Sequence, residues 1–140
     1  MENKLHLFLP ERPHYLNDFA VRACFYLNLF QYDAELLIEY PRKIADDCHG
    51  QCWGDSERVE LVVAHQSMGE GLTRKEKMLA LAHELVHAQQ YLSGRLKDHD
   101  PTPDKYTVIW NRRKIIWRDD IPDEELPWEV EAYGREEEIY

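Results

Sequence analysis

The stretch LALAHELVHAQQ, residues 79–90, contains two histidines four positions apart within an apolar run. Before it, Thr73 and Glu76 have the spacing of a capping box, in which each side chain satisfies a backbone N–H at a helix start. After it, Gly94 suits the left-handed position that follows a last helical turn. The sequence therefore predicts one helix over residues 74–92. The breadth of its apolar surface predicts that this helix is central and buried.

His83 and His87 lie one turn apart on the same face of this predicted helix, with about 5–6 Å between their Cβ atoms. Two imidazoles at that spacing can bind one zinc ion (Zn2+) through bonds of about 2.0–2.1 Å. Glu84 lies about 100° further round the helix, where it can contact a metal-bound water. The alternative is a buried helix whose histidines are satisfied by core hydrogen bonds, but it also buries Glu84 at a cost in free energy. The motif therefore predicts a zinc site with Glu84 as general base.

A catalytic zinc takes three protein ligands and keeps one position open for water. The segment PWEVEAY, residues 127–133, resembles the glutamate helix of the gluzincin clan. In that helix a small residue follows the ligand glutamate at the third position and a polar residue at the fourth. The resemblance implies Glu129 as the third ligand and Ala132 as the small residue that permits close helix packing. Tyr133 stands where the clan usually has Asp or Asn, and its hydroxyl is a candidate to orient a histidine or to stabilise the oxyanion.

Other residues remain alternatives for these roles. Glu131 would point elsewhere on a helix, whereas His99 and Asp100 lie in a loop that could fold back to the metal. Tyr91 is a second candidate oxyanion donor. The glutamates at 136–138 are predicted to form a solvated acidic face.

The order of the predicted elements resembles small HExxH proteins of the SprT-like and IrrE/ImmA-type families. The resemblance covers about residues 35–135 in layout, and the ending LPWEVEAY is similar to uncharacterised bacteriophage metallopeptidases among the minimal gluzincins. SprT-like proteins use a histidine as third ligand, and none occurs here at the expected distance, so the gluzincin comparison fits better. The resemblance implies a zinc-dependent peptidase. It also implies that the strand before the active helix, RVELVVA, offers an edge to an extended peptide substrate. The odd number of cysteines and the lack of a signal peptide predict a cytoplasmic location, in the bacterial host if the chain is phage-encoded.

The remaining segments complete an α+β prediction. The predicted elements are an amphipathic helix over 16–31 capped by Asn17 or Asp18, strands over 34–41 and 58–65, a β-hairpin over 106–118 that turns at Asn111, and a last helix that begins near Pro127. Segments 42–57 and 95–105 are predicted to be turns and loops, with Cys52 and Trp53 packing a tight turn beneath the sheet. The expected architecture is a single domain, residues 1–140, with a small mixed or antiparallel sheet, a central HExxH helix and a C-terminal glutamate helix.

The formal net charge of −10 lies mostly in residues 119–140. An acidic chain does not release counterions from nucleic acid, which argues against nucleic-acid binding. Its three cysteines, Cys24, Cys48 and Cys52, are an odd number and a poor disulfide framework, as expected in a reducing compartment. A structural zinc site at Cys48, His49 and Cys52 would lack a fourth ligand. No apolar run has the length of a signal peptide or a membrane span.

Two rival functions remain compatible with the sequence. One is a non-catalytic, peptidase-like module that binds a protein partner. The other is a peptidase held inactive by its acidic tail, in which a carboxylate from residues 136–140 caps the zinc. The presence of Glu84 favours an enzyme that acts on a protein or peptide substrate. Neither the cleavage specificity nor the oligomeric state follows from the sequence.

Overall fold

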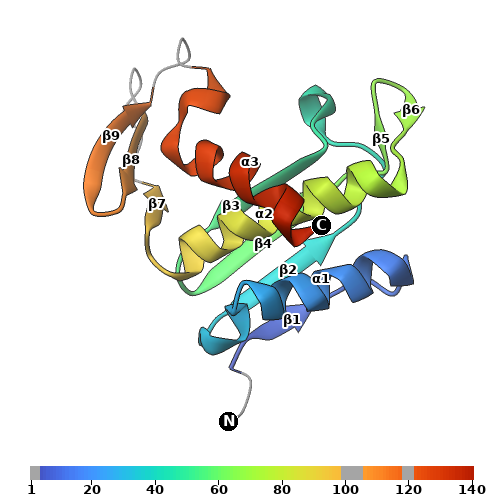
Figure 1. Ribbon diagram of the computed structural model, residues 1–140, viewed down its shortest axis with the longest axis horizontal. Helices are drawn as coiled ribbons and strands as arrows, with labels where there is room; N and C mark the ends of the chain where they lie inside the picture. The colour runs from blue at the N-terminus through green and yellow to red at the C-terminus, as the bar shows by residue number, and fades with distance from the viewer. Residues whose placement is uncertain (1–3, 99–105, 118–121) are drawn as a thin grey trace.

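The computed structural model describes residues 4–98, 106–117 and 122–140 and has the predicted α+β architecture (Figure 1). Its elements are β1 (His6–Phe8), α1 (His14–Tyr26), β2 (Glu35–Glu39), β3 (Gly50–Gly54), β4 (Arg58–Val63), β5 (Gln66–Ser67), β6 (Glu70–Gly71), α2 (Arg74–Leu92), β7 (Leu96–Asp98), β8 (Tyr106–Trp110), β9 (Arg113–Trp117) and α3 (Pro127–Ile139). Short 3-10 helices lie at Leu29–Gln31, Ala45–Asp47 and Asp123–Glu125. His99 and Asp100, two of the alternative ligands, lie outside the described residues.

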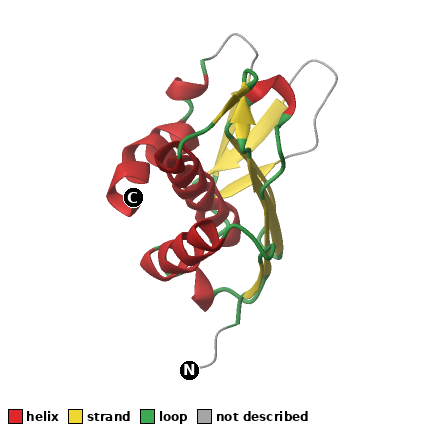
Figure 2. Ribbon diagram, turned by 90° about the vertical axis from the view of Figure 1, so that its right-hand side faces the viewer, coloured by secondary structure: helices red, strands yellow, loops and turns green. Residues whose placement is uncertain are grey.

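A mixed four-stranded sheet forms one layer and the helices form the other (Figure 2). The strand order is β1-β2-β4-β3, in which β1, β2 and β4 are parallel and β3 is antiparallel to β4. Helix α2 packs directly on β3 and β4, with α1 beside it, and α3 packs against α2. Small sheets formed by β5-β6 and β7-β8-β9 complete the fold. Helix α2 is therefore the element that the others surround.

The core lies between the sheet and the helices. Alternating residues of β4, Val59, Leu61 and Val63, face inward and are buried, because successive side chains of a strand point to opposite faces. The predicted apolar face consists of Leu16, Phe19, Ala20, Ala23, Leu27 and Phe30. All are buried except Phe30, which lies in the following 3-10 turn and is partly buried. Burial of each large side chain contributes about 1.5–3 kcal/mol relative to exposure. The core thus fixes α2 against the sheet.

The predicted ends of α2 are confirmed. The Thr73 hydroxyl accepts from the Glu76 N–H at 3.1 Å, and the Glu76 carboxylate accepts from the Thr73 N–H at 2.9 Å. Gly94 follows the last turn with a φ of 78°. The second half of the helix is buried around most of its circumference, as predicted. Among the described residues, no helix is long and apolar enough to cross a membrane.

Helix α1 begins earlier and ends earlier than predicted. Pro13 is its N-cap rather than Asn17 or Asp18. The side-chain amide of Asn17 instead donates a hydrogen bond to the Pro10 carbonyl. The helix ends at Tyr26, because Asn28 adopts a left-handed φ of 59° and a short 3-10 turn follows. The apolar spacing runs through both elements, so it could not reveal the break between them.

The segment GQCWG forms the edge strand β3 rather than the predicted turn. Residues Gly50–Gly54 pair with Val59–Val63, so β4 has a neighbour on each side. The prediction that RVELVVA offers an exposed edge is therefore wrong, and β3 is the edge strand on this side. Cys52 and Trp53 accordingly lie within a strand. Glycine has a low strand propensity, but pairing with the apolar β4 overrides that preference.

The β8-β9 hairpin is confirmed, with its turn at Asn111 and Arg112. Both turn residues have positive φ, 49° and 69°, as a two-residue type I′ turn requires. Leu96–Asp98, predicted to be part of a loop, instead pairs with β8 as β7. Three-residue strands such as β7 and β1 are too short to produce a recognisable alternation in the sequence.

Replacement of Thr73 by alanine should destabilise the protein by about 1 kcal/mol, because a backbone N–H at the start of α2 loses its side-chain acceptor. Urea denaturation followed by circular dichroism measures the change in the free energy of unfolding. Thr73→Ser keeps the hydroxyl and should remain close to wild type. Equal destabilisation by both substitutions would contradict a capping role.

Candidate metal centre

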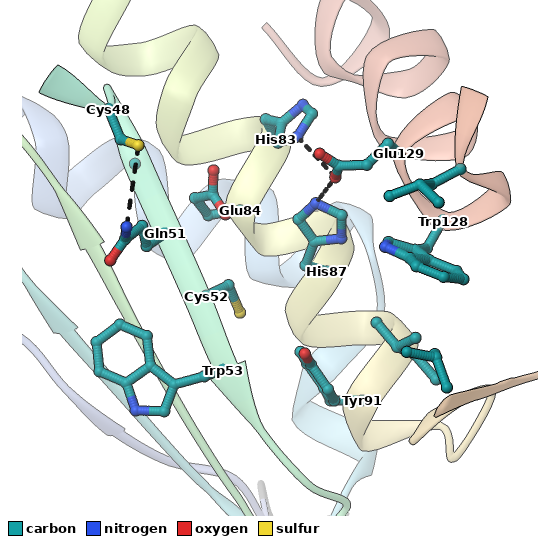
Figure 3. A pocket seen from close by; sticks show the side chains of 14 residues that line it. Cys48, Gln51, Cys52, Trp53, His83, Glu84, His87, Tyr91, Trp128 and Glu129 are labelled. Atoms are coloured by element: carbon teal, nitrogen blue, oxygen red, sulfur yellow. Dashed lines mark hydrogen bonds and ion pairs between the residues drawn. The ribbon is translucent and has the colours of Figure 1, made fainter. Parts of the chain in front are cut away.

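Two neighbouring histidines of α2 and a glutamate distant in the sequence come together at the contact between α2 and α3. His83, His87 and Glu129 form a potential metal-binding group whose ligand atoms all lie within 4.8 Å of one another. The Nε2 atom of His83 is 3.3 Å from Oε1 of Glu129, and Nε2 of His87 contacts the same oxygen. Figure 3 shows Glu129 reaching from α3 to both rings. Each imidazole therefore directs its Nε2 atom toward Oε1 of Glu129.

The other ring nitrogen of each histidine is held by an oxygen acceptor. Nδ1 of His83 lies 2.8 Å from Oε2 of Glu136, and Nδ1 of His87 lies 2.8 Å from Oε1 of Gln90. A carboxylate or amide oxygen only accepts, so both Nδ1 atoms carry the proton. In the neutral ring the lone pair then belongs to Nε2, on the side of Glu129. Partners of this kind fix the tautomer and orientation of metal-ligating histidines.

The amide orientation of Gln90 follows from its own partners. Its Nε2 donates to the Trp128 carbonyl at 3.0 Å and to the Glu131 carboxylate at 3.2 Å, which leaves Oε1 for His87. Glu131 in turn accepts from Arg95 at 2.8 and 2.6 Å. Glu131 is therefore held by these partners, not brought to the His–His–Glu group. Gln90 is not among the predicted site residues, although it lies three residues after His87 on the same side of the helix.

The prediction that Glu136 belongs to a solvated acidic face is wrong. It lies seven residues, or about two turns, after Glu129, so both carboxylates face α2. Its side chain reaches Nδ1 of His83, on the side of the ring away from Glu129. Glu138, which is more exposed, contacts Arg135 and the Tyr26 hydroxyl. The described contacts of the acidic tail therefore support the site from outside and do not cap its Nε2 atoms.

Glu84 lies on the β3 side of the two histidines, opposite Glu129 (Figure 3). It is only 7% exposed and lines the cavity beside them. A Cβ atom at Gly50 would lie 2.9 Å from its Cγ and 3.0 Å from its Oε2. The absence of a side chain at position 50 thus makes the room that Glu84 occupies. Burial raises the pKa of Glu84 to about 7, against the opposing effect of the two neighbouring histidines.

Tyr133 is half exposed, and its ring packs on His83 with 4.5 Å between ring centroids. The contact restrains the imidazole, and the predicted role of the hydroxyl remains a prediction. Tyr91 is buried one turn beyond His87 and lines the same cavity. Cys48 and Cys52 also line the cavity, with neither among the metal-binding group found in the described residues.

Glu129 forms an ion pair with each of the two histidines. Burial alone would lower the pKa of His83, but its hydrogen bond to Glu129 and the charge of Glu84 raise it to about 9. The pKa of His87 is raised in the same way despite its burial. Burial alone would raise the pKa of Glu129, but the two histidines lower it to about 2. A bound cation would replace the two Nε2 protons, since metal ligands must be deprotonated.

Comparison with known proteins finds no relative for this chain. It matches no protein-family model, no curated protein and no solved structure. The interpretation of the site therefore depends on its own residues and geometry: a His–His–Glu group with a buried carboxyl beside it.

Substitution of Glu129 by glutamine should lower zinc affinity by more than the roughly 10–100-fold that loss of an outer partner costs, because a charged ligand is lost. Competition titration against a zinc-binding dye measures the dissociation constant. Glu137→Gln is the matched control, an exposed position on the same helix with the same change. Wild-type affinity in the Glu129 variant would remove Glu129 from the site.

The stability of the metal-free protein should fall as the pH rises from 6.5 to about 9. His83, whose pKa is raised from 6.5 to about 9, contributes stability that is complete below pH 6.5 and is lost through that interval. Glu129, whose pKa is lowered from 4.5 to about 2, contributes stability that is lost as the pH falls from 4.5 to 2. Urea denaturation with a chelator tests both limbs. Glu129→Gln should flatten the alkaline limb, and an unchanged limb would contradict the assigned ion pairs.

Proposed function

We propose that this protein is a zinc-dependent metallopeptidase with a minimal gluzincin arrangement in residues 1–140. The observation that supports it most is that, in both histidines, one ring nitrogen points to Glu129 and the other is occupied by a separate hydrogen-bond acceptor. Both Nε2 atoms converge on Glu129, while Glu136 and Gln90 occupy both Nδ1 atoms. A buried helix that only needed to satisfy its histidines would not require this convergence.

The donor set suits zinc. Two imidazole nitrogens and one carboxylate oxygen form one of the common protein ligand sets of catalytic zinc sites, and they leave a fourth position open. The outer partners Gln90 and Glu136 are of the type that raises ligand basicity. When bound, zinc would polarise a substrate carbonyl and lower the pKa of a coordinated water toward about 7.

Glu84 is the proposed general base. Its carboxyl lines the cavity between the histidines and β3, within the volume that a substrate must enter. It takes a proton from the attacking water and returns it to the leaving amine. Gly50 is the positioning residue behind it, since any side chain there would displace the carboxyl. Tyr133 and Tyr91 remain the candidate donors to the developing oxyanion.

The edge strand β3 is the proposed substrate support. The Ala64 N–H donates to the His49 carbonyl and the Asp55 N–H to the Arg58 carbonyl, which sets the alternation of bonds between β3 and β4. By that alternation Gly50 and Gly54 direct their backbone groups away from β4. An extended peptide can add to this edge as a further strand and pass beside Glu84.

Glu84→Gln should retain zinc and lower the rate of peptide hydrolysis by at least about 100-fold, because the amide cannot accept the proton. The assay is cleavage of a mixed peptide library by the zinc-loaded protein, analysed by mass spectrometry, with metal content measured on the same sample. Glu137→Gln, at an exposed position of α3, is the control.

Full hydrolytic activity of the zinc-loaded Glu84 variant would show that another group is the base. Stoichiometric zinc with no cleavage of any library by the wild-type protein would instead favour the non-catalytic binding module. Absence of zinc uptake in wild type would overturn the proposal altogether.

A further inference from the structure

A cavity of about 610 Å³ extends from the candidate metal centre along α2. Its polar end contains the two histidines, Glu84 and Glu129. Its other end is lined by Tyr91, Leu96, Val108, Leu126 and Trp128. Among these five residues the polar side-chain groups are the Tyr91 hydroxyl and the Trp128 indole N–H, and the other three side chains are aliphatic. Cys52 and Trp53 of β3 line the opposite side of the cavity (Figure 3). The cavity thus changes from charged to apolar along its length.

The spacing along α2 relates the apolar end to the reaction site. His83, His87 and Tyr91 follow one another at four-residue intervals, so they lie on one face of the helix. At a rise of 1.5 Å per residue, Tyr91 is about 6 Å beyond His87. An extended peptide advances about 3.3 Å per residue. A side chain that enters the apolar end therefore belongs to a residue one or two positions from the metal-facing carbonyl.

The apolar end is a recess with a buried floor rather than an exposed patch. Leu96, Val108 and Leu126 are only 3%, 3% and 5% exposed. Trp128 packs on Trp110, with 6.2 Å between ring centroids. These residues come from β7, β8 and the start of α3, segments that follow α2 in the chain. Apart from Tyr91 of α2, the residues of the recess therefore come from different segments than His83, Glu84 and His87.

We propose that this recess binds a large apolar side chain, such as leucine or phenylalanine, of the polypeptide substrate at a residue adjoining the cleaved bond. The inference rests on the proposed peptidase function, since it assigns the recess to the substrate of that site. An apolar side chain gains from leaving water there, at about 0.8 kcal/mol per buried CH₂. A charged side chain would be desolvated without an ionic partner among the described residues of the recess.

Two pairs of small probes test the recess, one with zinc and one without. The first pair is the dipeptide hydroxamates that carry a leucine or an alanine side chain, titrated against the zinc-loaded wild-type protein by calorimetry. The second pair is N-acetyl-leucinamide and N-acetyl-alaninamide, titrated against the metal-free protein and followed by NMR chemical shifts. We expect the leucine member of each pair to bind at least about tenfold more tightly.

A matched pair of variants locates the preference. Val108→Phe fills the recess and should reduce the leucine-over-alanine preference at least about tenfold. Ile109→Phe makes the same kind of change at the next residue of β8, whose side chain points to the opposite face of the strand. The preference should be unchanged in that variant. The wild-type titrations test the inference even if either variant fails to fold.

The outcomes separate the inference from the function on which it rests. Zinc uptake and cleavage with equal affinity for both members of each pair would overturn the recess assignment and leave the peptidase proposal standing. A leucine preference in the metal-free protein without zinc uptake would support the recess as an apolar side-chain site and overturn the peptidase. Equal loss of preference in both variants would also contradict the assignment to this recess.

Discussion

The structure depends on how four polar side chains on the buried half of α2 are satisfied. His83, Glu84, His87 and Gln90 lie on a helix that is enclosed by the sheet on one side and α3 on the other. An unpaired polar group in such a place costs several kcal/mol, so each must have a partner or a functional reason for lacking one. Helix α3 supplies the partners of both histidines and of Gln90, through carboxylates and one backbone carbonyl. The docking of α3 is therefore directed by charge and hydrogen bonds as much as by apolar contact.

A series of hydrogen bonds also connects the site to more distant parts of the molecule. From His87 the hydrogen bonds run through Gln90 and Glu131 to Arg95, at the start of the segment that leads to β7. The Arg95 guanidinium also lies over the Trp110 ring, 5.3 Å from its centroid. Since Trp110 backs Trp128, the orientation of a candidate metal ligand and the wall of the recess share a support. A substitution at Arg95 or Glu131 would therefore affect both the orientation of His87 and the packing of Trp128.

Much of this organisation was predictable from the sequence because it depends on local spacing. A four-residue interval fixes His83 and His87 on one face of a helix, and a capping box fixes where that helix begins. The assignment of Glu129 needed a resemblance, because a contact across 42 residues leaves no local signal. The edge strand β3 was missed since its glycines and polar residues read as a turn, and only pairing with β4 makes it a strand. Glu136 was missed because a glutamate run on a final helix usually faces solvent, and only the packing of α3 reveals which of its carboxylates turns inward.

The salt bridges between Glu129 and the two histidines have a consequence for how a metal ion would bind at this group. Glu129 contacts both histidines, so the three candidate ligands are brought together by the packing of α3 on α2. Binding of a divalent ion there would displace protons from the histidines, so the binding equilibrium would depend on pH as well as on metal concentration. An ion that binds the folded chain and not the unfolded chain would also strengthen the docking of α3 on α2, because its three ligands come from both helices.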